Sequence, residues 1–86
     1  MMNAKEARAM VENYNKKVEE AREERVNKFL ETTVAKAIEE NSRDGYDIAR
    51  FTPFVDNQDT ELMIKKLKEL GYKVEQVNNR FIFVEW

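Results

Sequence analysis

The side chains of this chain that have acid–base or ligand chemistry are carboxylates, lysines, arginines and tyrosines, because the sequence contains no histidine and no cysteine. It therefore lacks the commonest general base and transition-metal ligand, and it also lacks thiol nucleophiles, disulfides and cysteine metal sites. Its two glycines, Gly45 and Gly71, stand alone, which excludes the glycine-rich loops that cradle phosphates. Ser42 is expected to be a turn residue. We expect no catalytic residue, no metal and no cofactor, so the chain is not expected to be an enzyme.

Two groups of carboxylates are candidates for binding, and both have a simpler interpretation. Aspartates near predicted loops have the ligand chemistry for Mg²⁺ or Ca²⁺, but their spacing differs from that of calcium loops, and such residues usually cap turns. These aspartates are Asp44, Asp47, Asp56 and Asp59. The pairs Glu19-Glu20 and Glu23-Glu24 are interleaved with Arg22 and Arg25, which favours a solvated helix face over a surface for a basic partner.

Basic side chains indicate two alternative ligand sites. Arg50 and Arg80, together with Tyr46, are candidates for gripping an anionic nucleotide at a subunit interface, although each arginine also fits a surface cation on an edge strand. A second set resembles the recognition helix and wing of a winged-helix DNA-binding protein: Lys65, Lys66, Lys68, Lys73 and Arg80. That domain needs another short helix before the recognition helix, and residues 52–57 are too few for one and contain Pro53.

The overall charge argues against nucleic acid as a partner. The chain has 86 residues with 15 basic and 17 acidic side chains, for a net charge of −2. Residues 1–45 carry 9 basic and 10 acidic groups and residues 46–86 carry 6 and 7, so neither part is a basic arm. Strong phosphate-backbone binders usually have a basic excess. No signal-peptide pattern or apolar run near 18 residues occurs, so we expect no membrane association and a cytoplasmic location.

One long helix is predicted over residues 3–41. Asn3 and Glu6 have the spacing of a capping box, and Gly45 is a left-handed stop after the helix. Such a helix is about 57 Å long, whereas a compact domain of this size is about 30 Å across. Either it breaks near residues 13–15, where helix propensity dips, or its N-terminal half projects.

The projecting half carries an apolar seam at heptad spacing: Ala7, Val11, Tyr14, Val18 and Ala21. After it, Val26, Leu30, Val34 and Ile38 step by four and are expected to pack on the rest of the domain. A projecting helix with a seam favours a homo-oligomer, most simply a dimer. We expect this interface to comprise the seam and Trp86.

Residues 46–86 are predicted to form a β-α-β-β core, so that residues 1–86 are a single α+β domain. The expected strands are residues 46–51, 72–77 and 80–86, with a helix over residues 58–70 whose buried stripe is Met63, Leu67 and Leu70. Phe54 and Val55, in the loop before the helix, are expected to tuck into the core.

The last strand is apolar on both sides, which places it in the middle of a small three-stranded mixed sheet. A right-handed crossover through the helix over residues 58–70 makes the two outer strands parallel to each other and the middle strand antiparallel to both. A two-residue turn at Asn78-Asn79 with positive φ would set Val74 opposite Phe83. The helix over residues 58–70 is expected to cover one face of the sheet. The back half of the long helix, or a second subunit, is expected to cover the other.

Three stretches of the chain resemble small orphan accessory proteins of phages and prophages of Gram-positive bacteria. They are Met-Asn-Ala-Lys-Glu-Ala-Arg at residues 2–8, Leu-Lys-Glu-Leu-Gly-Tyr-Lys-Val at residues 67–74, and an aromatic-rich strand ending in Trp86. The resemblance implies a phage protein that binds a host macromolecule, such as an inhibitor that blocks a bacterial defence protein or sequesters a nucleotide signal. It assigns no functional residues.

Overall fold

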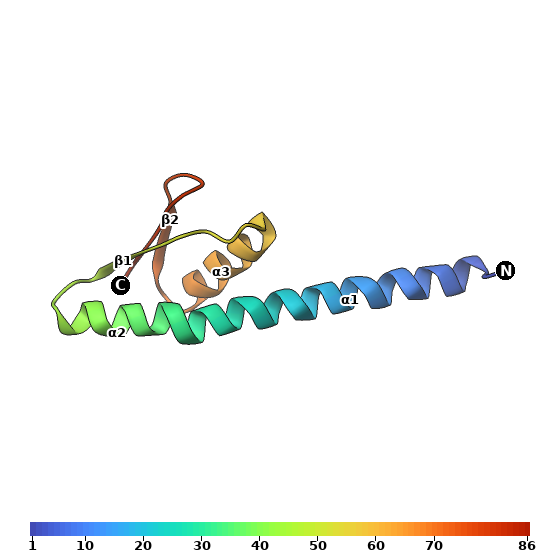
Figure 1. Cartoon of the computed structure of the whole chain (residues 1–86), viewed down its shortest axis with the longest axis horizontal. Coiled ribbons are helices and arrows are strands. Elements are labelled where there is room, and N and C mark those ends of the chain that lie inside the picture. Colours follow the sequence, from blue (N-terminus) through green and yellow to red (C-terminus); the bar gives the residue numbers. More distant parts are fainter.

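The computed structural model describes residues 1–86 and has an α+β architecture with a long N-terminal helix, as the sequence predicts (Figure 1). The elements in chain order are α1 (Ala4–Phe29), the π turn η1 (Leu30–Val34), α2 (Ala35–Arg43), β1 (Ile48–Phe51), α3 (Asn57–Glu69), β2 (Lys73–Gln76) and β3 (Ile82–Glu85). The first three form one uninterrupted helical rod, and the remaining elements gather along its C-terminal half.

Local signals at both ends explain where the rod begins and ends. The Asn3 side chain accepts a 2.9 Å hydrogen bond from the Glu6 backbone N–H, and the Glu6 carboxylate accepts one of 3.3 Å from the Asn3 amide. After α2, Gly45 takes φ 86°, the left-handed conformation expected of a helix stop. Residues 13–15 lie inside α1, so the rod does not break there and its N-terminal half projects. The molecule therefore measures 63 × 23 × 19 Å.

The π turn keeps two buried valines of the rod on the same face. Val26 and Val34 are eight residues apart, and eight α-helical residues turn through two turns plus about 80°. A π turn accommodates one extra residue, so the rotation falls to that of about seven residues, two turns less about 20°. Both side chains are consequently buried in the core. The run of apolar residues in steps of four thus indicated a π turn that the sequence analysis did not identify.

The sheet has the order β1-β3-β2, which confirms that the last strand is central. Both pairs are antiparallel, so the predicted strand directions, with the middle strand antiparallel to both of its neighbours, are confirmed. The sheet is antiparallel and not mixed, because the outer strands β1 and β2 pair only with β3 and never with each other.

The register of the β2–β3 hairpin differs by one residue from the expected one. Val74 lies opposite Val84, not Phe83, because the turn contains three residues instead of two. The Asn78 side chain accepts hydrogen bonds from the backbone N–H groups of Arg80, at 2.7 Å, and Phe81, at 3.1 Å. This side-chain cap replaces the positive-φ turn, and only glycines in the chain have positive φ. A shift of one residue exchanges the faces of a strand relative to its neighbour.

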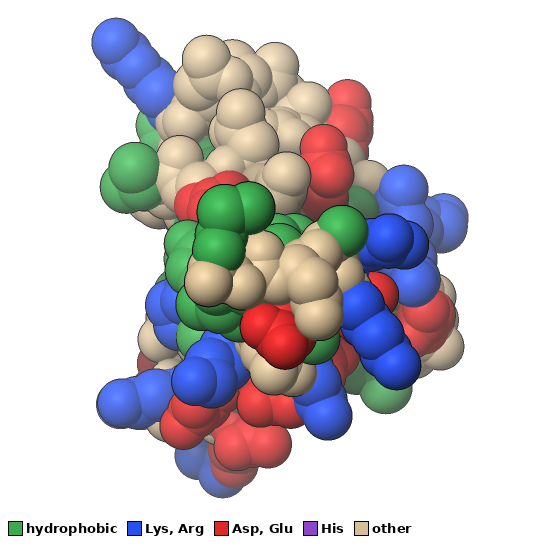
Figure 2. Space-filling model, turned by 90° about the vertical axis from the view of Figure 1, so that its right-hand side faces the viewer, with side chains coloured by type: hydrophobic (Ala, Val, Ile, Leu, Met, Phe, Trp, Pro, Cys, Tyr) green, Lys and Arg blue, Asp and Glu red, His purple; other side chains and the backbone are tan.

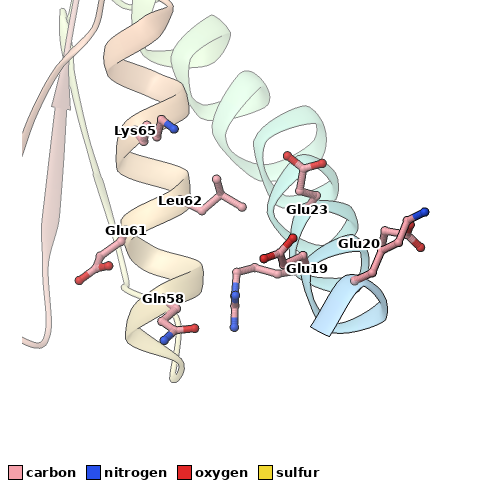
Figure 3. Close-up of a pocket in the computed structure, with 9 residues that line it drawn as sticks. Glu19, Glu20, Glu23, Gln58, Glu61, Leu62 and Lys65 are labelled. Atoms are coloured by element: carbon pink, nitrogen blue, oxygen red, sulfur yellow. The ribbon is translucent and has the colours of Figure 1, made fainter. Parts of the chain in front are cut away.

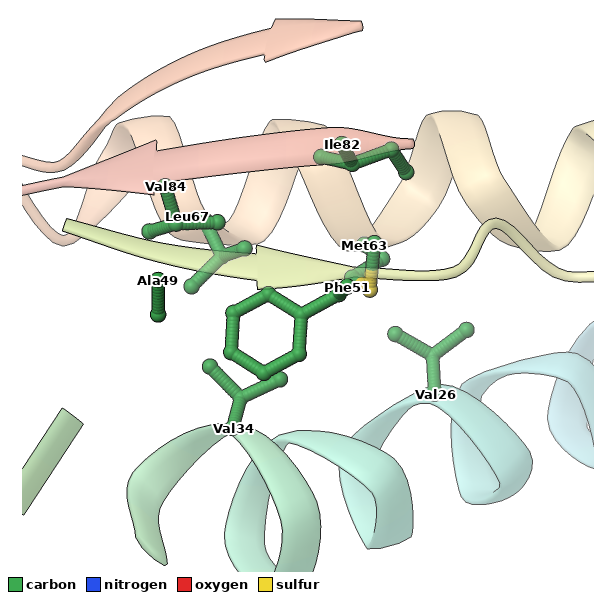
Figure 4. Close-up of a cluster of buried hydrophobic side chains, with 8 residues drawn as sticks. All are labelled: Val26, Val34, Ala49, Phe51, Met63, Leu67, Ile82 and Val84. Atoms are coloured by element: carbon green, nitrogen blue, oxygen red, sulfur yellow. The ribbon is translucent and has the colours of Figure 1, made fainter. Parts of the chain in front are cut away.

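The core lies on one face of the sheet, between β1 and β3 on one side and both the rod and α3 on the other (Figure 4). Its eight members are Val26, Val34, Ala49, Phe51, Met63, Leu67, Ile82 and Val84. The rod and α3 therefore share a face, and the expectation that they cover opposite faces is wrong. Leu70 is 71% exposed because it caps the end of α3.

The loop before α3 contributes one of its two expected apolar side chains. Phe54 packs against Phe29, with ring centroids 5.0 Å apart, as expected. Val55 is fully exposed instead of buried.

Removing one residue from the π turn should be tolerated. Deletion of the exposed Thr33 converts the turn to α-helix while Val26 and Val34 stay in phase, so the melting temperature should change by only a few degrees. Deletion of the exposed Lys36 in α2 rotates Ile38 by about 100° away from the core. We expect this deletion to lower the free energy of unfolding by about 2 kcal/mol or more. In a domain of this size, that loss lowers the melting temperature by roughly 10 °C. Thermal denaturation followed by circular dichroism measures both deletions. An equal fall in melting temperature for the two variants would contradict this account.

Candidate functional site

The N-terminal part of α1, residues 4–21, is an arm with no fully buried residue. Along it, Val11 is 58% and Tyr14 68% exposed, Ala7 is exposed, and Val18 and Ala21 are half-buried. The N-terminal part of the seam predicted from the sequence, Ala7, Val11 and Tyr14, thus lies in solvent, whereas its last two members are partly covered. Viewed from the tip of the arm, apolar side chains come to the surface among charged side chains of both signs (Figure 2).

The seam continues the face of the rod that packs on the core. Val18 and Phe29 are eleven residues apart, which is three helical turns plus about 20°. Phe29 packs edge-to-face on Phe51 and Phe54, with ring centroids 6.2 and 5.0 Å away. The seam therefore faces the side of the rod on which the core lies.

A buried carboxylate fixes the base of the arm to α3. Asp59 is only 4% exposed, and its two oxygens accept hydrogen bonds of 3.0 Å from Arg22 Nε, Arg25 Nε and Arg25 Nη2. The hydrogen bond from Arg25 lowers the pKa of Asp59 against the opposing effect of burial, and Arg22 lowers it further. Asp56, not Asp59, caps α3, with its side chain accepting from the Gln58 backbone N–H at 2.8 Å. The sequence analysis treated Asp59 as a turn residue and missed this role.

A groove of about 810 Å³ opens between the base of the arm and α3 (Figure 3). Its walls carry the carboxylates of Glu19, Glu20, Glu23 and Glu61 and the cations of Lys16, Arg22 and Lys65, with Leu62 as the only hydrophobic side chain. Small-molecule pockets are mostly apolar with a few polar groups. The groove is instead a charged, solvated channel between two diverging helices.

The three candidate ligand-binding residues do not all meet. The Arg50 guanidinium lies over the ring of Phe81, 4.7 Å from its centroid, and Arg80 is the residue before Phe81. Arg50 therefore stacks on Phe81, and Arg80 lies in the neighbouring hairpin turn at the same end of the sheet. Tyr46 precedes the other end of β1, about 13 Å along the chain from Arg50. Arg50 points away from the core, on the outer face of the sheet with Ile48 and Phe83.

The other candidate residues serve mainly structural roles. No three carboxylates are grouped so as to hold a metal ion. Lys66 Nζ bonds Asn27 Oδ1 at 2.8 Å and lies 3.5 Å from Glu23, so this lysine of the winged-helix set is held against α1. A single helix, α3, connects β1 and β2, without the extra helix that a winged-helix domain needs. No helix is long and apolar enough to cross a membrane.

Trp86, expected at the subunit interface, contributes to packing within the chain. It lies edge-to-face on Tyr72, with ring centroids 6.4 Å apart, and is half-buried against the core.

Stability should depend on the ionisation of Asp59. Because its pKa is lowered on folding, the carboxylate stabilises the fold at pH values above its unfolded pKa of about 3.9. This contribution is lost as the pH falls through the folded pKa. Asp59→Asn should lower the free energy of unfolding at pH 7 by about 1–3 kcal/mol and flatten the acid limb of the stability curve. Asp56→Asn is the control, since asparagine also caps helices and Asp56 is half-exposed. Urea unfolding from pH 7 to pH 3 measures both; indistinguishable curves would disprove the role of Asp59.

Comparison with known proteins gave no relative from which a function can be transferred. No family model matches the chain, and no curated protein or solved structure matches it significantly.

Proposed function

We propose that this chain is a non-catalytic binding module that assembles through its arm into a homo-oligomer, most simply a dimer, and acts on a host macromolecule. The observation that supports self-association is the exposed seam of the arm, where Val11 and Tyr14 remain in solvent within an uninterrupted helix.

Contact with a partner would stabilise the helical conformation of the arm. Isolated helices shorter than about 12–15 residues are marginal in water, and helices in proteins owe most of their stability to packing of an apolar face. In the single chain, the arm packs on nothing before Val18. Burial of the seam against another chain would add about 25 cal/mol for each Å² of apolar surface removed from water. A second copy is the simplest partner because most soluble oligomers are symmetric homo-oligomers.

The outer face of the sheet is the surface we propose for the host macromolecule. Ile48 is exposed there, Phe81 and Phe83 are half-buried, and neither helix covers them. Aromatic side chains with an adjacent arginine are typical of protein-binding surfaces. The resemblance to phage accessory proteins makes a bacterial defence protein our first candidate for this partner.

Self-association should depend on Tyr14. Tyr14→Glu places a charge in the middle of the seam and should shift the mass towards that of the 10.3 kDa monomer at micromolar concentration. Asn13→Glu introduces the same charge one residue away, off the seam, and should leave the mass unchanged. Analytical ultracentrifugation of both variants and the parent chain measures this. A monomeric parent chain at micromolar concentration would disprove self-association.

A second candidate function is capture of an anionic nucleotide, and it is favoured by Arg50, which stacks on Phe81, and by Arg80 in the turn that precedes this ring. A nucleobase can stack on an aromatic ring while a phosphate pairs with the arginines. A nucleotide present at 100 times its Kd should stabilise the fold by about 2.7 kcal/mol. A thermal-shift panel of mono-, di- and cyclic nucleotides measures this. Arg80→Gln should abolish a true shift, whereas Lys36→Gln, far from Phe81 on α2, should not. No shift with any nucleotide would rule this function out for the panel.

A further inference from the structure

We infer that the seam is occupied by the seam of a second copy running antiparallel, with Val11 opposite the partner's Tyr14 and Ala7 opposite the partner's Val18. This inference rests on the proposed self-association and specifies the direction and register of the two arms. Size and charge along the seam, and the position of the core, support it.

The position of the core excludes a parallel pair. Packed helices lie about 8–10 Å apart, whereas the molecule is 23 and 19 Å wide across its long axis. Because the seam faces the side of the rod that carries the core, a parallel pair would force two cores into the same gap. In the antiparallel register, Arg22 at the base of one arm lies opposite Asn3 of the partner subunit. The body of each core, from Val26 onward, then lies beyond the start of the partner's helix at Ala4, and only the first two turns of that helix lie beside the groove at the base of the arm.

The sizes of the seam side chains fit the same register. In an antiparallel pair, the large Tyr14 meets the medium Val11, and Val18 meets the small Ala7. Two small side chains face each other only at the end of the seam, where Ala21 meets Ala4. A parallel pair would set Tyr14 against the partner's Tyr14 in one layer and Ala7 against the partner's Ala7 in another. Cores pack best when large and small residues alternate across facing positions, without overpacked layers or voids.

Charge along the arm favours the same direction. Residues 19–24 carry four glutamates and one arginine, whereas residues 4–18 carry four cations and two glutamates. A parallel pair would place both acidic segments side by side, and like charges repel. An antiparallel pair separates the two acidic segments and places each beside the first turn of the other arm, where Lys5 offsets Glu6 and the positive end of the helix dipole attracts carboxylates. It also sets the two helix dipoles in opposite directions, a favourable arrangement.

Cysteine cross-linking tests the inference directly, because the chain has no cysteine of its own. Two single variants are made, Ala7→Cys and Val18→Cys, and one of them carries a tag that changes its size on a gel. A short thiol-specific cross-linker is added to each variant alone and to an equal mixture of the two. In the antiparallel register, identical positions are separated by about 16 Å along the axis. Neither variant alone should therefore cross-link efficiently. The mixture should give the mixed-size product, up to the statistical ceiling of about half of the dimers.

The outcomes separate this inference from the proposed function. Efficient cross-linking of each variant with itself would show a parallel pair, which overturns the inference and leaves self-association intact. An oligomeric mass in ultracentrifugation without any arm cross-link would place the interface elsewhere and also overturn it. A monomeric mass for the parent chain would overturn the proposed self-association itself. Glu12→Cys, on the opposite side of the helix from the seam, is the control for random collision and should give no product alone or in mixtures.

Discussion

The ion-paired carboxylate of Asp59 is the contact on which the geometry of the whole chain depends. It lies in the first turn of α3, where a negative charge is favoured, and it receives both Arg22 and Arg25 from the base of the arm. A buried charge that loses its partner is costly, so the two helices are held together at this point. The arm leaves the core immediately N-terminal to it. The direction in which the arm leaves the core is therefore fixed relative to the sheet at its base.

The rod has a buried C-terminal part and an exposed N-terminal arm because the chain has few large apolar side chains. Eight buried side chains form the core, and all of them lie at or after Val26. A domain this small buries only about 60–65% of the surface of its unfolded chain, so the core alone supplies modest stability. The arm nevertheless extends the helix well past the core and keeps apolar side chains in water. A small core together with an exposed apolar arm fits a chain whose stable form includes a second copy. These two features are the physical basis of the self-association we propose.

Local signals made much of the fold predictable, whereas contacts between distant residues did not. The Asn3 cap, the Gly45 stop and the central position of β3 follow from residue chemistry within a few positions, and the structure confirms them. The hairpin register was wrong because one Asn78 side chain, by bonding two backbone N–H groups, lengthens the turn by a residue. The role of Asp59 was missed because its arginines are 34 and 37 residues away. The heptad spacing of the seam can be read from the sequence, but its alignment with the core-facing side required the structure.

The alternation of side chains along β3 also separates the two surfaces on which the proposed function depends. It places Ile82 and Val84 in the core and leaves Phe81 and Phe83 on the outer face, beside Arg50 and away from both helices. The surface proposed for a host partner is therefore distinct from the seam. In the antiparallel dimer that we infer, the two cores lie at opposite ends of paired arms, so two outer faces are held apart by a rigid spacer. Two linked sites can raise overall affinity for a multivalent partner by about 10²–10⁴ without any new contact, provided that their spacing matches. The length of the arm then has a function of its own, since it sets the spacing at which two copies of a target are bound together.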